Sequence, residues 1–175
     1  MTLTLYDAIV PSWLQTLGGL GAVLERGRAH CAETGLDPQA LVETRLAPDM
    51  HPLRFQVISV MHHSAGALDG AANGSFSRPP DLGPLDYPAL QALIAETVAR
   101  VSAVTPEQVN AVVGRDLDFR VGDRSLMSFT AEDFLLSFSV PNFYFHATTA
   151  YDILRLKGVA LSKRDYLGAV RVKRA

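Results

Sequence analysis

The stretch Pro141-Asn142-Phe143-Tyr144-Phe145-His146-Ala147-Thr148-Thr149-Ala150 decides how this chain is interpreted. It lies within a long helical pattern, in which residues three and four apart share one face. That face carries, in chain order, Leu135, Phe138, Asn142, His146, Thr149, Ile153 and Leu156. Its ends are apolar and its middle is polar. Because a buried polar group without a partner costs about 1–3 kcal/mol, the middle needs hydrogen bonds, a ligand or a metal.

Apolar residues that recur at helical spacing predict three further long helices. The four predicted helices cover residues 3–32, 52–72, 87–104 and 130–157. Gly35 and Gly158 are predicted stops, and Thr130 is the predicted cap of the last helix. Pro141 lies inside that helix and predicts a kink near residues 137–141.

Shorter elements fill the connections. Asp37-Pro38 and Thr105-Pro106 are signals for the start of a helix. Gly122-Asp123 lies between two strand-like runs and predicts a β-hairpin, whereas the chain from residue 159 onward is expected to be irregular. The predicted fold is all-α: one four-helix bundle domain over residues 1–175, with short extra helices and a small β-hairpin before the last long helix.

Composition narrows the class of protein. Hydrophobic residues make up 48% of the 175 residues and charged residues 19%, which is ample for a core. A net charge of −2 gives no electrostatic signal for nucleic acid. No apolar run is long enough to cross a membrane and no secretory signal is recognised, so a cytoplasmic protein is expected. Gly18, Gly19 and Gly21 would let another helix approach closely, and a homodimer is one expectation.

The polar middle of the stripe is the candidate ligand-binding site. Asn142, His146 and Thr149 share one face of the last helix. Tyr151, which follows shortly after, is a further side chain that could line a pocket. These four residues are the predicted contacts of a small molecule.

A metal is the second interpretation of the same face. A histidine and a second donor four residues apart are the usual way for one helix to present two ligands to one ion. Here the pair is Asn142 and His146, and an amide is a poor ligand for zinc or nickel. The second long helix offers His62 and His63, which lie about 100° apart, so that only one can point inward.

A purely structural role is the third interpretation. Asn142, His146 and Thr149 could hydrogen-bond one another, backbone groups freed by Pro141, or an ordered water. The residues alone leave open a closed polar network, a small-molecule pocket without metal, and a divalent-metal site.

Three segments resemble a known family. They are Leu46-Ala47-Pro48-Asp49-Met50, the stretch from Pro141 to Arg155, and Lys163-Arg164-Asp165-Tyr166-Leu167-Gly168. They resemble the DUF1993 family of domains of unknown function, within the DinB/YfiT-like metalloenzyme superfamily. The resemblance covers essentially the whole chain and implies a DinB-like four-helix bundle.

The resemblance also implies where a metal would bind. Superfamily members are similar in carrying three histidine ligands, one on the second helix and two, four residues apart, on the last helix. The metal set implied here is His62, Asn142 and His146, with Asn142 where the family pattern has a histidine. That departure weakens the affinity expected for zinc or nickel, the divalent metals to consider first.

The sequence therefore predicts a DinB-like bundle without a complete three-histidine metal site, with a small-ligand cavity near Asn142 and His146. One alternative is a divalent-metal-dependent enzyme, for which the resemblance suggests a thiol-dependent transferase. The other is a non-catalytic structural or oligomerising protein.

Overall fold

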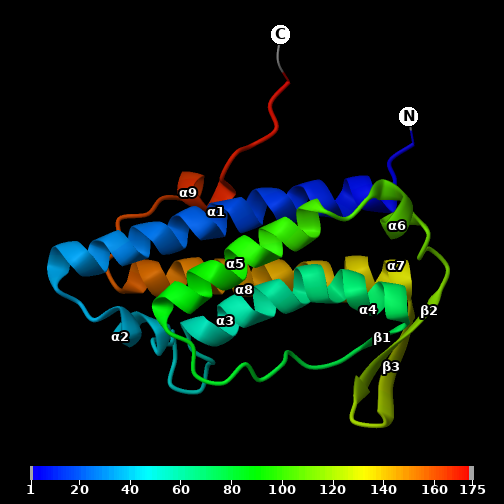
Figure 1. The fold of residues 1–175 in the computed structure, drawn as a ribbon, viewed down its shortest axis with the longest axis horizontal. Coiled ribbons are helices and arrows are strands. Elements are labelled where there is room, and N and C mark those ends of the chain that lie inside the picture. The colour runs from blue at the N-terminus through cyan, green and yellow to red at the C-terminus, as the bar shows by residue number, and fades with distance from the viewer. Residues whose placement is uncertain (1, 174–175) are drawn as a thin grey trace.

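Four long helical segments run along one another in the computed structural model, which describes residues 2–173 (Figure 1). They are α1 (Leu5–Thr34); α3 (Leu53–Met61) continued by η1 (His62–Gly66) and α4 (Ala67–Asn73); α5 (Tyr87–Ser102); and η2 (Phe134–Ser139) continued by α8 (Val140–Leu156). The chain is thus mostly helical, as predicted. Met1, Arg174 and Ala175 of the predicted domain lie outside the described residues.

Capping residues explain where several helices begin and end. Asp37 caps α2 (Pro38–Val42) through the backbone N–H of Gln39. Thr105 forms a capping box with Gln108 at the start of α6 (Pro106–Asn110). Thr130 caps α7 (Ala131–Asp133), which leads into η2. Gly35 ends α1 with a φ of 73°, which only glycine adopts without strain. These signals were predicted and are confirmed.

A small sheet at one end of the helices departs from an all-α fold. Its strands are β1 (Ser75–Phe76), β2 (Asp116–Val121) and β3 (Arg124–Thr130), in the order β1-β2-β3. The antiparallel pair β2–β3 turns at Gly122-Asp123, as predicted. The parallel strand β1 was not predicted, because two residues are too short to show an alternating pattern.

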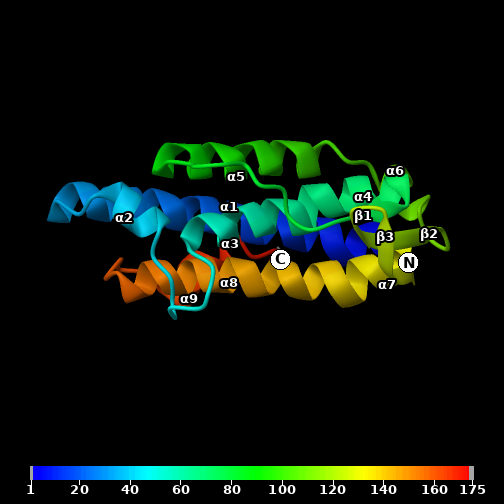
Figure 2. The same ribbon diagram turned by 90° about the horizontal axis from the view of Figure 1, so that it is seen from below.

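The helices pack chiefly in two pairs, α3 with α8 and α1 with α5 (Figure 2). Trp13 of α1 is fully buried, and its ring lies 5.8 Å from that of Phe143 of α8. Its indole Nε1 is buried, and none of the described residues accepts a hydrogen bond from it. None of the described helices is long and apolar enough to cross a membrane.

Two of the long segments each contain a π-helical turn. η1 holds both histidines of the second helix, and η2 ends two residues before Pro141. The disturbance predicted at residues 137–141 therefore takes the form of a wider turn just before the proline. A π-helical turn changes the angle at which the following residues leave the helix, and such turns are frequent at functional sites.

The C-terminal segment forms a helix where an irregular tail was predicted. This helix, α9 (Lys163–Leu167), lies on α1. A Cβ on Gly19 would lie 2.5 Å from the backbone oxygen of Tyr166, so the glycine permits the contact. The amide of Gln15 also donates to the Leu167 carbonyl at 2.9 Å. The close approach expected at the glycines of α1 thus occurs within the chain, and the homodimer stays a prediction.

Candidate functional site

His146 of α8 is held by Gln56 of α3. Its Nδ1 lies 2.7 Å from Gln56 Oε1, while Gln56 Nε2 donates to the His51 carbonyl at 2.9 Å. A carbonyl only accepts, so the amide nitrogen of Gln56 must face His51 and its oxygen must face His146. His146 therefore carries its proton on Nδ1, and Nε2 keeps a lone pair.

His63 of η1 is the histidine that reaches His146. The two rings lie 5.9 Å apart, centre to centre, and are nearly parallel at 14°. His63 Nδ1 lies 3.4 Å from Ser139 Oγ, and that hydroxyl donates to the His63 carbonyl at 3.1 Å. The Ser139 hydroxyl proton is used in the bond to the His63 carbonyl, so the hydroxyl oxygen accepts from the protonated Nδ1 of His63. Like His146, His63 then keeps a lone pair on Nε2.

Both imidazoles are neutral at pH 7. Burial lowers the pKa of His63 to about 3, helped by the charges that His62 and His146 would carry. Burial likewise lowers the pKa of His146 to about 4, with a further contribution from His51. Neutral imidazoles with a free Nε2 accept hydrogen bonds or bind metals, but they are poor proton donors near pH 7.

His62 points elsewhere, which corrects the predicted pairing of His62 with His146. Its ring stacks on Phe76 at 4.2 Å, and its Nε2 donates to the Ser77 carbonyl at 2.8 Å. Adjacent helical residues diverge by about 100°, and the unpredicted strand β1 brings Phe76 to the His62 side. His63, the alternative that the sequence left open, is therefore the neighbour of His146.

The other predicted residues have local partners. Asn142 Nδ2 donates to the Phe138 carbonyl at 2.7 Å, one turn earlier in the same segment. Thr149 is buried and donates to the Phe145 carbonyl at 2.7 Å. The ring of Tyr151 packs on that of Tyr166 in α9, 5.9 Å away, and so belongs to another contact.

Two residues of the site were missed by the sequence analysis. Gln56 lies seven residues before His63, and Ser139 lies three before Asn142, so both spacings place them on the helix faces that carry the predicted residues. Buried Ser59, on the same face as Gln56, has no partner for its Oγ in the part of the chain that the structure describes. A polar stripe on the second helix was therefore the missing signal.

The donor set does not fit the three-histidine site that the resemblance implies. Among residues 2–173, no three side chains of His, Cys, Asp or Glu lie together in a way that could hold an ion. The neighbouring donors are Nε2 of His63 and Nε2 of His146, and Asn142, whose nitrogen is engaged, lies one turn before His146. Two imidazoles and an amide are a weak set for zinc or nickel.

The cavity predicted near Asn142 and His146 stays a prediction. A hollow of about 570 Å³ does lie along α8, with Tyr144, Phe145 and Thr149 among its lining residues. Neither Asn142 nor His146 lines this hollow, so it is a different feature of the same helix.

Comparison with known proteins agrees with this fold. Residues 5–167 match the family described as domain of unknown function (DUF1993). A crystal structure of a DinB family member protein from Shewanella denitrificans is similar, with 26% sequence identity and a TM-score of 0.79. The match covers 98% of this chain and 96% of that one. No curated protein is significantly similar in sequence.

Proposed function

The chain belongs to the DUF1993 family, and from the geometry of its site we propose that it is a DinB-like four-helix bundle that binds a small ligand between α3 and α8. The ligand would contact His146 and Asn142 on α8 and His63 on η1. Its class is a neutral molecule with hydrogen-bond donors, such as an alcohol or a primary amide.

The observation that carries this proposal is the fixed tautomer of two neighbouring imidazoles. Gln56 Oε1 and Ser139 Oγ occupy Nδ1 of His146 and His63, respectively. Among residues 2–173, neither Nε2 atom has a hydrogen-bond partner, and the partly exposed His146 leaves room for a ligand to approach. A ligand donor would pair with these acceptors, and the low pKa values keep both of them available near pH 7.

Ligand-detected NMR with a panel of small diols and primary amides tests the proposal. Members of the panel should bind the wild-type protein and lose binding to His146→Gln and His63→Gln. His30→Gln, on α1 and outside this site, where the His30 ring contacts the Lys157 carbonyl, is the matched control and should bind as the wild type does. Equal binding by the wild type and both site variants, or no binding by any protein, would refute the proposal.

A divalent-metal enzyme is the second candidate, and one observation favours it. Metal-bound histidines nearly always donate their other ring N–H to an oxygen atom, as His63 and His146 do here. Zinc or nickel would need a further ligand, for which Asn142 Oδ1 and water are the candidates. Such an ion supplies Lewis acidity when bound, and a thiol-dependent transferase is the first reaction class to test.

Metal content distinguishes the two candidates. Protein purified without chelator or nickel resin should contain stoichiometric zinc or nickel if the second candidate is right. His63→Ala and His146→Ala should then lose the metal, and Gln56→Ala should weaken binding by roughly 10–100-fold. Wild-type protein that stays metal-free after incubation with either ion would refute this candidate.

A further inference from the structure

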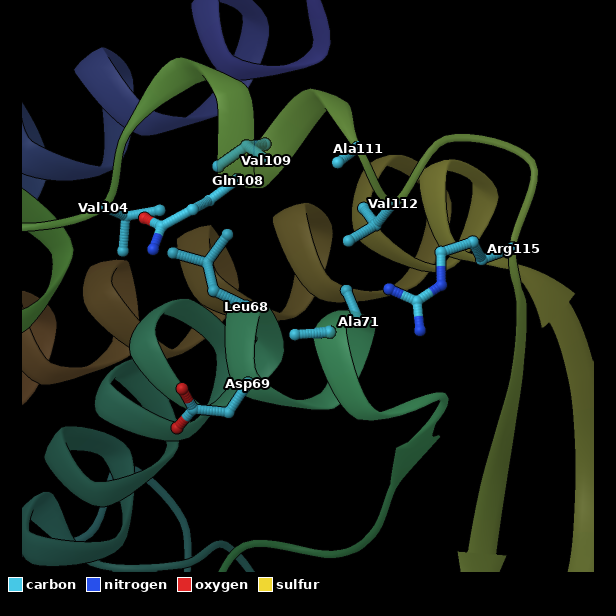
Figure 3. A pocket seen from close by; sticks show the side chains of 10 residues that line it. Leu68, Asp69, Ala71, Val104, Gln108, Val109, Ala111, Val112 and Arg115 are labelled. Atoms are coloured by element: carbon cyan, nitrogen blue, oxygen red, sulfur yellow. The ribbon is translucent and has the colours of Figure 1, made fainter.

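A second cavity, of about 270 Å³, shares none of the residues of the His63–His146 site. It lies between α4, the chain after α5, and α6 with the turn that follows it (Figure 3). Leu68, Val104, Val109 and Val112 provide an apolar wall. Leu68, Val109 and Val112 are themselves buried, so this wall is part of the packed structure.

Arg115 supplies a positive charge at one end of the cavity. Its side chain extends past Val112 toward Ala71 of α4 (Figure 3). Its backbone carbonyl accepts from the N–H of Ala131 at 2.8 Å, which fixes where the side chain starts. Within residues 2–173, no hydrogen bond or ion pair engages the guanidinium, so its five N–H donors are available.

The other polar groups of the cavity do not compete for that charge. Asp69 forms an ion pair with Arg100, and its carboxylate points away from Arg115 (Figure 3). Gln108 Oε1 accepts from the backbone N–H of Thr105 at 2.9 Å. Its amide nitrogen remains as a donor beside Leu68 and Val104 (Figure 3). One unpaired cation, one amide donor and an apolar wall therefore meet here.

We propose that this cavity binds a short aliphatic monocarboxylate, with the carboxylate on Arg115 and the alkyl chain along Leu68, Val104 and Val109. A guanidinium binds a carboxylate through two parallel hydrogen bonds, and one cation suits one negative charge. The volume suits a chain of roughly four to eight carbons, since pockets for larger, drug-sized ligands span about 300–1,000 Å³. A phosphate would leave the apolar wall without a partner and would call for more than one cation.

Calorimetric titration with sodium hexanoate tests the proposal. The wild-type protein should bind with saturation, and Arg115→Gln should weaken binding about tenfold or more, because a charge-assisted pair is lost. Arg124→Gln, at an exposed position on β3, is the matched control and should bind as the wild type does. Ala72→Leu, which adds volume to an exposed lining position on α4, should also weaken binding.

Two comparisons make the result decisive. Methyl hexanoate, which has the same chain without the charge, should bind far more weakly than hexanoate. His146→Gln should retain full hexanoate binding, which separates this cavity from the ligand site proposed above. Equal affinity of the wild type and Arg115→Gln for hexanoate, or no saturable binding by the wild type, would overturn the proposal.

Discussion

The contact of α1 with α5 and the contact of α3 with α8 are both buried, but they treat polar groups differently. Between α1 and α5, the Tyr87 hydroxyl donates to the Leu24 carbonyl at 2.7 Å, above Gly27. Between α3 and α8, His63 and His146 use one ring nitrogen each and leave the other as an acceptor. Burial alone therefore does not distinguish the two contacts, whereas the unused ring nitrogens of His63 and His146 do.

Gly27→Ala, in the contact of α1 with α5, should give the largest loss of stability. A Cβ at this position would lie 2.2 Å from the Tyr87 hydroxyl and 3.2 Å from Leu154 Cδ2. Overpacking together with loss of the hydroxyl bond should lower the free energy of unfolding by about 2–4 kcal/mol, measured by urea denaturation. Gly18→Ala, with open space around it, should instead stabilise α1. Equal stabilities of the two variants would contradict the tight packing inferred here.

Substitutions of His146 and Gln56, which are hydrogen-bonded between α3 and α8, should have non-additive effects on stability. His146→Leu leaves Gln56 Oε1 buried without its donor, and Gln56→Leu leaves His146 Nδ1 without its acceptor. Each change should cost about 1–3 kcal/mol, whereas the double variant should cost less than the sum, because both partners are then apolar. Additive losses in urea denaturation would mean that the bond contributes nothing to stability.

Mild acid should lower the stability of the protein through the histidines at the contact with α8, before it protonates the carboxylates. Native His63 and His146 stay neutral down to a pKa of about 3 and about 4, and the pKa of His62 is also lowered by burial. The unfolded histidines gain a proton near their ordinary pKa of 6.5, so the unfolded state binds more protons below that pH.

The free energy of unfolding should therefore be highest above pH 6.5 and fall from there toward pH 5. The expected slope is up to about 1.4 kcal/mol per pH unit for each histidine. Urea denaturation at pH 5, 6 and 7 measures the slope. His63→Gln and His146→Gln should each flatten it, while His30→Gln, on α1 and outside this contact, should keep it. The same slope in all four proteins would contradict the assignment.

Tyr87→Phe should give the smallest effect, about 1 kcal/mol, because it removes one hydrogen bond and leaves the ring in place. Combined with Gly27→Ala, it should recover part of the stability that Gly27→Ala loses, since the clashing oxygen is gone. Thermal denaturation of the two single variants and the double variant measures this coupling. A double variant less stable than Gly27→Ala would show that another atom sets the clash.

The long helices could be predicted because their apolar spacing and caps are local signals. Thr105 with Gln108, and Gly35 at its left-handed position, behave as their chemistry dictates. Strand β1 and helix α9 were missed, because each depends on contacts with residues distant in sequence. Tertiary context overrides local pattern for elements this short.

For the candidate site, the sequence predicted a polar face around His146 with His62 as its neighbour on the second helix. The structure places His63 beside His146 instead. The choice depends on a π-helical turn and on the aromatic partner Phe76, and a one-dimensional spacing shows neither. Gln56 and Ser139 were overlooked because an isolated glutamine or serine is common on helix surfaces.

Trp13 gives the protein a built-in optical reporter. It is the only tryptophan in the sequence, it is fully buried, and its indole N–H has no hydrogen-bond partner within residues 2–173. Its fluorescence should therefore be blue-shifted in the native protein and move to longer wavelength when α1 separates from Phe143 of α8. One emission band can follow unfolding in every variant above without a label.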